Sequence, residues 1–256
     1  MIDRLAALSL SLLALSCAHA PDAAAPAPSA PDYAALVASP DRTDDDKKMD
    51  SGRSPAQLLA FLGVKPGMKV GELVAGRGYT TELLARAVSP GGTVYAENPP
   101  FAIEKFLSKP WAERLERPAN KGVVRCDREL EDPLPPEAKD LDLVVTYANY
   151  HDAVGLFKTN TAKMNAAVFA ALKPGGRYAV IDSSAKAGTG TADVETLHRI
   201  DEEYVKKDVE AAGFKLERSD DFMRNPNDPR DWNASPNAAG EKRGTSDRFA
   251  LMFVKP

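Results

Sequence analysis

Residues 70–81, Val-Gly-Glu-Leu-Val-Ala-Gly-Arg-Gly-Tyr-Thr-Thr, constrain the fold more than any other part of the chain. An apolar run over residues 68–74 predicts a buried strand, and a helical pattern begins near Tyr79. Between them lies a Gly-x-Gly turn, at Gly76 and Gly78. Glycine suits this place because the backbone must turn sharply and approach a ligand closely. A strand, a glycine turn and a helix are typical of the first half of a nucleotide-binding α/β unit.

Length and composition bound the class of protein. The chain has 256 residues, enough for one α/β domain of ordinary size and a tail. Its formal net charge is -4 and no basic stripe with interleaved aromatic residues occurs, so we expect no nucleic-acid partner. The two cysteines, Cys17 and Cys126, exclude a disulfide scaffold. We interpret Cys126, at the end of an apolar run, as a small buried residue.

The N-terminus resembles an export signal. Arg4 is followed by an apolar stretch over residues 5–15, which is too short to span a bilayer and is typical of the h-region of a signal peptide. Cys17 follows it, as in a bacterial lipoprotein signal, where the cysteine is lipidated. Cleavage after Ala20, which would give a soluble periplasmic protein, and an uncleaved leader are the alternatives. We therefore expect an exported protein, lipid-anchored through Cys17 on the periplasmic side of the cell envelope.

The sequence predicts three parts: a lipoprotein-type signal peptide over residues 1–16, a disordered Ala/Pro-rich tether over 17–41, and a folded domain over 42–256. The domain begins with a charge-dense segment, residues 42–53, interpreted as a solvated helical turn at its edge. Ser54, Pro55 and Gln57 then predict a capped helix start.

Strands and helices alternate through most of the domain. Strands are predicted at residues 68–74, 93–97, 122–126, 141–147 and 177–182, with helices at 79–88, around 103–107 and at 162–172. The tail departs from this pattern, with a long helix at 193–212, a strand at 214–218, a patternless loop at 223–247 and a last strand at 249–254. These elements predict an α/β fold with a seven-stranded, mostly parallel sheet, an antiparallel last strand and helices on both faces.

Several of these stretches resemble a known superfamily. Residues 72–78, Glu-Leu-Val-Ala-Gly-Arg-Gly, are similar to the first motif of the class I methyltransferases that use S-adenosyl-L-methionine (SAM). Residues 172–176 and 211–214 resemble the turn before the fifth strand and the end of the last helix of that Rossmann-like fold. Three more stretches, 149–152, 197–201 and 246–249, resemble a group of predicted exported bacterial methyltransferases. The resemblance covers residues 42–256.

The resemblance implies SAM as the cofactor. Glu97 lies about 20 residues beyond the glycine turn, where a carboxylate can accept both hydroxyls of a ribose. Asp127 resembles the residue that contacts the adenine amine, and we interpret Glu72 as a direct or water-mediated ligand. Nicotinamide dinucleotide is the rival ligand, but the third glycine of its fingerprint, expected near Thr81, is missing. The implied cofactor-binding residues are Glu72, Ala75, Gly76, Gly78, Tyr79, Glu97, Asn98, Asp127 and Asn149.

The candidate catalytic residues are Tyr147, His151 and Asp152, after the fourth predicted strand, where substrates of such sheets collect. His151 has a suitable intrinsic pKa for a general base, with Asp152 or a nearby carboxylate orienting it. A packing or capping role for His151 is the alternative. His198, placed in the long helix, is interpreted as a structural ion-pairing residue. The three histidines, His19 included, show no zinc spacing, so no metal site is predicted.

We therefore expect a SAM-dependent methyltransferase with a small-molecule acceptor, whose contact with a membrane is through the lipid anchor alone. The sequence does not indicate an oligomeric state. The alternative is a catalytically inactive protein of the same fold that binds a ligand or partner at the cell envelope. Two residues motivate it: Val74 stands where the motif usually has glycine, and Ser183 where histidine often follows the acidic residue of the fifth strand. SAM is also made in the cytoplasm, whereas the signal directs the chain outside.

Overall fold

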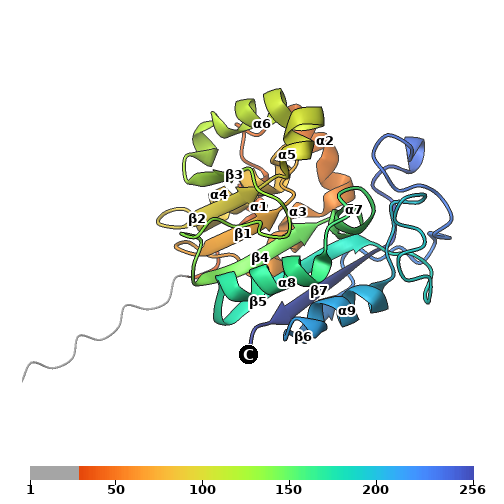
Figure 1. Cartoon of the computed structure of the whole chain (residues 1–256). Coiled ribbons are helices and arrows are strands. Elements are labelled where there is room, and N and C mark those ends of the chain that lie inside the picture. Colours follow the sequence, from red (N-terminus) through yellow and green to blue (C-terminus); the bar gives the residue numbers. More distant parts are fainter. Residues whose placement is uncertain (1–28) are drawn as a thin grey trace, which may run out of the picture.

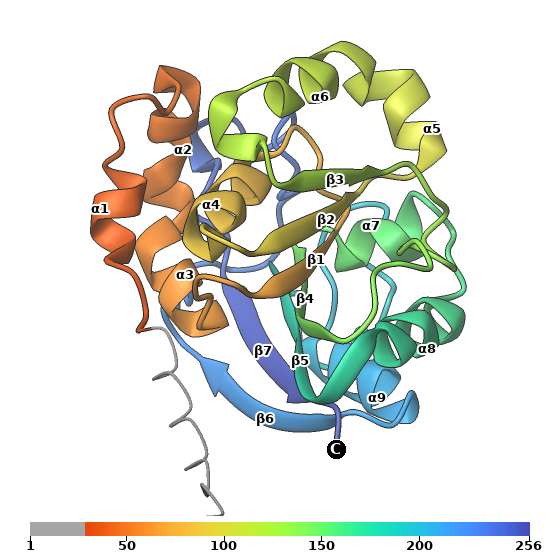
Figure 2. The same cartoon turned by 90° about the vertical axis from the view of Figure 1, so that its left-hand side faces the viewer.

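The computed structural model describes residues 29–256, which fold around one mixed β-sheet. The predicted signal peptide, Cys17 and the first part of the tether lie outside the described residues. In the described part, seven strands lie in the order β3-β2-β1-β4-β5-β7-β6 (Figure 2). Their bounds are Lys69–Leu73 (β1), Thr93–Glu97 (β2), Val123–Cys126 (β3), Leu141–Tyr147 (β4), Leu172–Ser183 (β5), Lys215–Asp220 (β6) and Arg248–Val254 (β7).

Strands β1 to β5 pair in parallel, and β7 runs antiparallel to both of its neighbours, β5 and β6. The antiparallel pairing of β6 and β7 arises because one loop joins them without a crossover helix. The predicted fold class, a mostly parallel seven-stranded sheet with an antiparallel last strand, is confirmed.

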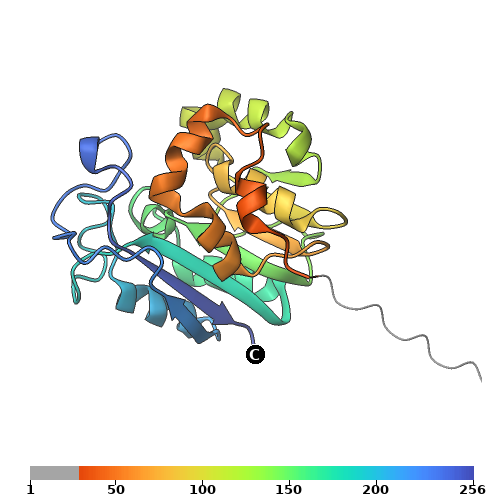
Figure 3. The same ribbon diagram turned by 180° about the vertical axis from the view of Figure 1, so that it is seen from behind.

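Helices cover both faces of the sheet (Figures 1 and 2). One face carries α1 (Tyr33–Val37), α3 (Pro55–Leu62) and α4 (Tyr79–Val88). Figure 3, which views the molecule from behind, has this face toward the viewer. The other face carries α7 (Tyr150–Gly155), α8 (Thr161–Ala171) and α9 (Glu202–Ala211). The remaining helical segments are α2 (Asp44–Arg53), α5 (Pro100–Ala102), the π-helical turn η1 (Ile103–Leu107), α6 (Ser108–Leu115), and the 3₁₀ turns η2 (Pro118–Asn120) and η3 (Gly240–Lys242).

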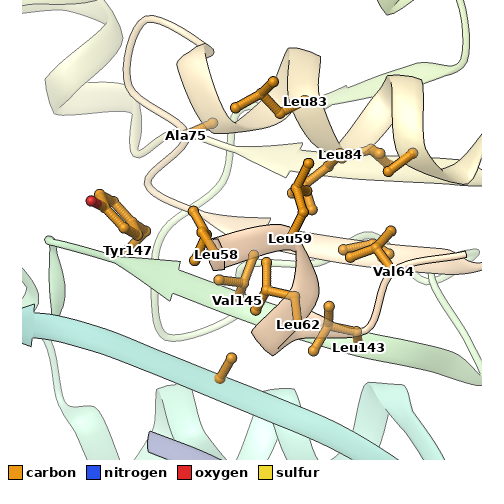
Figure 4. Close-up of a cluster of buried hydrophobic side chains, with 14 of the residues drawn as sticks. Leu58, Leu59, Leu62, Val64, Ala75, Leu83, Leu84, Leu143, Val145 and Tyr147 are labelled. Atoms are coloured by element: carbon orange, nitrogen blue, oxygen red, sulfur yellow. The ribbon is translucent and has the colours of Figure 1, made fainter. Parts of the chain in front are cut away.

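Two apolar layers, one on each face, hold the sheet. In Figure 4, Leu58, Leu59 and Leu62 of α3 pack over Leu143 and Val145 of β4, and all five side chains are buried. Each such side chain contributes about 1.5–3 kcal/mol on burial. The opposite layer joins the sheet to α8 and α9. Because both faces are covered, the inner strands β4 and β7 are nearly continuous apolar runs, which made them easy to predict from the sequence. The edge strand β6 is mostly polar and is exposed along its whole length.

The N-terminal boundary of the folded domain was predicted too late. The tether was expected to extend to residue 41, but α1 lies within it and packs on the core through partly buried Tyr33, Leu36 and Val37. The Tyr33 hydroxyl donates a hydrogen bond to the carbonyl of Val64 at 2.7 Å. These apolar residues stand out little among the surrounding alanines and prolines, but three of them in one turn are enough to dock it.

Two predictions around α2 and α3 were wrong. The charge-dense segment is not a solvated turn: α2 buries Asp46, and Arg42 just before it is buried and paired with Asp50. Ser54 does not cap α3 with its side chain, because its φ of 45° places it in the left-handed region between α2 and α3. Pro55 does begin the helix as predicted, and Gly63 ends it.

The predicted long helix over residues 193–212 is shorter and begins only at Glu202, with Asp201 as its N-cap. The segment before it is irregular because Ile200 forms a parallel bridge with Ser184 at the end of β5. His198 has a φ of 49°, which a helix does not allow. Within residues 29–256, no helix is both long and apolar enough to cross a membrane.

Candidate active site

A cleft of about 1280 Å³ lies beyond the carboxyl ends of β1 and β4, where a ligand of such a sheet is expected. Its walls come from α2, the glycine turn, the start of α7 and the loop over residues 234–244. Gly52 and Gly244 let the backbones of α2 and that loop approach closely, because a Cβ atom on Gly52 would lie 2.9 Å from the Cα atom of Gly244. Eight of the predicted site residues line the cleft: Glu72, Ala75, Gly76, Tyr79, Tyr147, Asn149, His151 and Asp152. Gly78, Glu97, Asn98 and Asp127 do not.

The backbone conformation of Val74 explains why the motif usually has glycine at this position. Its φ is 53°, in the left-handed region, which strains a β-branched residue. Two hydrogen bonds hold it there. Its N–H donates to Glu97 Oε2 at 2.9 Å, and its carbonyl accepts from Asn149 Nδ2 at 3.0 Å. The departure from the motif is therefore compatible with the fold, and it links the turn to β2 and to the end of β4.

The two glycines of the turn have different reasons to be glycine. Gly76 has a φ of 60°, and a Cβ atom there would meet nothing within 4 Å, so its backbone borders open space in the cleft. A Cβ atom on Gly78 would lie 2.6 Å from Cγ of Arg114 and 2.8 Å from Cζ3 of Trp111. Gly76 thus fits the predicted approach to a ligand, whereas Gly78 makes room for α6 instead.

Glu97 is fully buried behind the turn rather than on the cleft surface. Its Oε2 accepts from Val74, but its Oε1 is buried and has no hydrogen-bond partner among the described residues. Burial raises the pKa of Glu97 well above its usual range. A buried carboxyl oxygen without a partner is uncommon, so a donor such as a hydroxyl group would complete it. Its role as a ribose ligand stays a prediction.

Asn98 and Asp127 also lie away from the cleft surface. Asn98 holds the turn from behind: its Oδ1 accepts from the N–H of Gly76 at 2.8 Å, and its Nδ2 donates to the Gly76 carbonyl at 3.2 Å. Asp127 is paired with Arg125 at the molecular surface. Asn98 therefore positions a residue that lines the cleft, and the predicted adenine contact of Asp127 stays untested.

Glu72 lies at the base of the cleft and is almost wholly buried. Thr81 Oγ1 donates a hydrogen bond to its Oε2 at 2.5 Å. Burial raises the pKa of Glu72 to about 8, so the carboxyl is largely protonated and neutral at pH 7. It can then donate as well as accept a hydrogen bond.

Arg53, at the end of α2, is a cleft residue that the sequence did not indicate. Its guanidinium lies 4.6 Å from the ring centroid of Tyr79 and 5.3 Å from that of Tyr147. No carboxylate in residues 29–256 forms an ion pair with it. The Tyr79 hydroxyl donates to Asp50 Oδ1 at 2.6 Å, which fixes this ring. A positive group stacked between two rings is thus presented to the cleft.

His151 is held by Asp182, at the end of β5. The Asp182 carboxylate accepts the backbone N–H of His151 at 2.8 Å and its ring Nδ1 at 2.7 Å. Because a carboxylate only accepts, Nδ1 carries the proton and Nε2 has a free lone pair. Burial disfavours the charged ring, but the carboxylates of Asp182 and Asp152 outweigh it and raise the pKa of His151. The predicted orienting carboxylate is therefore chiefly Asp182.

The ring of His198 lies beside the ring of His151. Its Nδ1 lies 3.3 Å from Nε2 of His151, and the two rings are nearly perpendicular, at 82°. Asp152 Oδ1 lies 3.4 Å from His151 Nε2 and 3.3 Å from His198 Nδ1. The sequence predicted no metal site, yet these two histidines and Asp152 lie together, with one ligand atom of each within 4.8 Å of the others. The helix predicted over residues 193–212 would have placed His198 away from His151, so the sequence did not indicate that the two rings are neighbours.

The fold is that of the class I SAM-dependent methyltransferases. A SAM-dependent methyltransferase from Aquifex aeolicus superposes with a TM-score of 0.58 at 19% identity, over 84% of this chain and all of the other. A sarcosine dimethylglycine methyltransferase from Galdieria sulphuraria, assigned as such without proof, gives 0.57 at 17% identity, over 83% and 91% of the two chains. At sequence identities this low, the two similarities establish the fold alone.

In sequence, the chain is 40% identical over 70 residues to a protein-L-isoaspartate O-methyltransferase from Aeropyrum pernix. That match covers 27% of this chain and 25% of the enzyme, so the chain spans only a quarter of the length of this relative. No protein-family model matches the chain.

Proposed function

We propose that this protein is a SAM-dependent methyltransferase that acts on a small-molecule acceptor. One observation carries the proposal: the glycine turn after β1 and His151, which follows β4, face the same cleft. In this fold, a cofactor bound along the turn would present its reactive end to groups that follow β4. When bound, SAM supplies an electrophilic methyl group.

The residues present fit this cofactor. The backbone at Gly76 is open to the cleft, and the buried Oε1 of Glu97 has no hydrogen-bond partner in the described part of the chain, which suits a ribose hydroxyl. Arg53 suits the carboxylate of the methionine part, because it is a cation in the cleft that no described carboxylate neutralises. The cleft is also large enough for a nucleoside with an amino-acid tail.

The acceptor would lie at His151, Asp152 and Tyr147, which line the same cleft. An O–H, N–H or S–H acceptor must lose its proton, and His151 Nε2 is the basic atom that faces this place. The rest of the catalysis is the alignment of acceptor and methyl group in a site that excludes water. We further propose that the protein acts outside the cytoplasm, held by a lipid on Cys17, as its first residues indicate.

The experiment that tests the proposal is calorimetric titration of the full chain with SAM. Glu97→Ala should weaken SAM binding at least about tenfold, because it removes the carboxyl that would bond both ribose hydroxyls, and each such hydrogen bond contributes about 0.5–1.5 kcal/mol. Glu217→Ala, on the edge strand β6, removes a carboxylate of the same type far from the cleft and is the matched control. If wild type does not bind SAM, the proposal is wrong; if Glu97→Ala binds it equally well, Glu97 does not belong to the site.

A screen of phenols, thiols and amines with radioactive SAM then separates an enzyme from the inactive binding protein. Transfer of the methyl group to any of them supports the enzyme. SAM binding without transfer across the screen favours the binding protein.

A further inference from the structure

We propose that His151, His198 and Asp152 form a binding site for a divalent transition metal, best suited to Zn²⁺. The three ligand atoms are His151 Nε2, His198 Nδ1 and Asp152 Oδ1, one from each side chain. They come from α7 and from the irregular segment before α9, which are separated in sequence but meet at the cleft. Metal binding stands independently of SAM binding.

The distances are those of a tetrahedral zinc site. The three ligand atoms form a nearly equilateral triangle with sides of 3.3, 3.3 and 3.4 Å. A tetrahedron with such edges has its centre about 2.0–2.1 Å from each corner, which matches Zn–N and Zn–O bonds. An octahedron with the same edges needs bonds of about 2.3–2.4 Å, a length typical of Ca²⁺, which prefers oxygen ligands to imidazole.

The hydrogen bonds around the triangle also favour a metal. Asp152 Oδ1 is buried and lies beside both ring nitrogens, yet it has no hydrogen bond to either of them or to any other described group. A shared cation would complete this oxygen. Asp182 provides the outer support that metal-bound histidines generally have, since it accepts the Nδ1 proton of His151 and leaves Nε2 free to coordinate.

The backbone conformation of His198 also supports a functional site. Its φ of 49° lies in the left-handed region, where a non-glycine residue is strained, and such strain tends to occur at functional sites. Asp201 and Ile200 hold the segment that carries it: Asp201 Oδ2 accepts from the N–H of Gly188, and the N–H of Ile200 donates to the carbonyl of Ser183. The fold thus fixes His198 in a conformation that brings its ring to His151.

Three protein ligands leave one tetrahedral position, as in catalytic zinc sites. All three ligating side chains line the cleft, so this position would be open to a bound molecule. Resting on the proposed function, the metal would bind the oxygen, nitrogen or sulfur atom of the acceptor. Coordination would lower the pKa of such an atom, which would release its proton to solvent and use the freed electron pair to form a bond to the methyl carbon. The methyl–sulfur bond of SAM would break, with its electron pair left on the sulfur of the departing S-adenosylhomocysteine. The His151 lone pair then binds the metal rather than the proton.

The test uses the full chain, stripped with a chelator and titrated with Zn²⁺ against a chromophoric competitor. We expect one tight site per chain, and Co²⁺ in its place should give the intense visible absorption of a tetrahedral complex. His198→Asn and Asp152→Asn should each weaken Zn²⁺ binding at least about 100-fold, more than the loss of an outer partner causes. Because His198 is partly exposed, its variant should keep the fold, which its circular dichroism and melting temperature verify.

His19→Asn is the matched control, since it makes the same substitution at the remaining histidine, outside the described residues. It should leave Zn²⁺ affinity unchanged. The proposal is overturned if folded His198→Asn binds Zn²⁺ as wild type does, or if wild type shows no tetrahedral Co²⁺ spectrum; the histidines then share a proton instead. SAM titration of the same metal-free protein keeps the two proposals apart, because either ligand can bind while the other fails.

Discussion

At the scale of single residues, the glycine turn is held from behind as much as it is shaped for a ligand. Val74, Glu97 and Asn149 form one hydrogen-bonded chain that joins β1, β2 and β4. This chain fixes the strained Val74 backbone, and Asn98 fixes Gly76 in the same way. Contacts within the protein therefore fix the turn, which would lower the cost of ordering when a ligand binds.

The two glycines of this turn should respond differently to the same substitution. Gly78→Ala should destabilise the protein by about 2–4 kcal/mol, because the added methyl group meets Trp111 and Arg114 and the φ of 79° strains alanine. Gly76→Ala has only the backbone strain, about 1 kcal/mol, but places a methyl group in the cleft. Urea unfolding measures the first effect and SAM titration the second. Equal losses of stability would contradict the assignment of Gly78 to packing against α6.

At the scale of helices, charged side chains join α2, α4 and α6 around one buried carboxylate. Arg114 of α6 contacts both Asp46 of α2 and Glu82 of α4, and Arg86 and Arg117 also contact Glu82. Burial opposes ionisation of Glu82, but hydrogen bonds from the three arginines outweigh it and lower its pKa to about 2. This network joins α2, a wall of the cleft, to α4 and α6 through the pair of Arg114 and Asp46.

The stability of the protein should therefore fall in acid. A carboxyl with a lowered pKa stabilises the fold fully above its unfolded value, about 4.5, and this contribution is lost as the pH falls towards about 2. Glu82→Gln should be less stable at pH 7, by about 3–5 kcal/mol, because it removes the buried charge that the three arginines share. Its unfolding free energy should also change less than that of wild type between pH 4.5 and 2. Parallel pH curves for the two proteins would rule out this role of Glu82.

The helices and strands also differ in how well the sequence predicted their bounds. The bounds of α4, β2 and β4 were predicted correctly, because apolar runs between glycine and proline turns are local signals. The segment before α9 was not, because Ile200 pairs with Ser184 and so overrides a helical apolar pattern through a contact distant in sequence. The candidate site divides likewise. The cleft residues after β1 and β4 followed from their place at strand ends, whereas Arg53 and His198 enter through tertiary packing alone.

At the scale of the whole molecule, we predict that the location of the protein depends on residues before the folded domain. If Cys17 is lipidated, the protein should partition into the detergent phase, and Cys17→Ser should release it or leave it unprocessed. Several acyl chains are needed, since a single chain binds a membrane only marginally. Cys126→Ser is the control at the other cysteine, which is buried at the end of β3. Identical partitioning of wild type and Cys17→Ser, with the leader removed, would show that Cys17 is not the anchor.

The order of the strands in the sheet affects how the protein folds during its synthesis on the ribosome. Strand β7 follows the other six strands in the sequence but lies between β5 and β6, so β6 has no partner in the sheet until β7 has left the ribosome. Arg248 at the start of β7 also donates to the carbonyl of Gly52, which ties the end of the chain to α2. A nascent or prematurely terminated chain would thus expose the apolar edge of β5 and lack a finished cleft. Proteases and chaperones would therefore recognise a chain without β7, and the cleft would be complete only after β7 has joined the sheet.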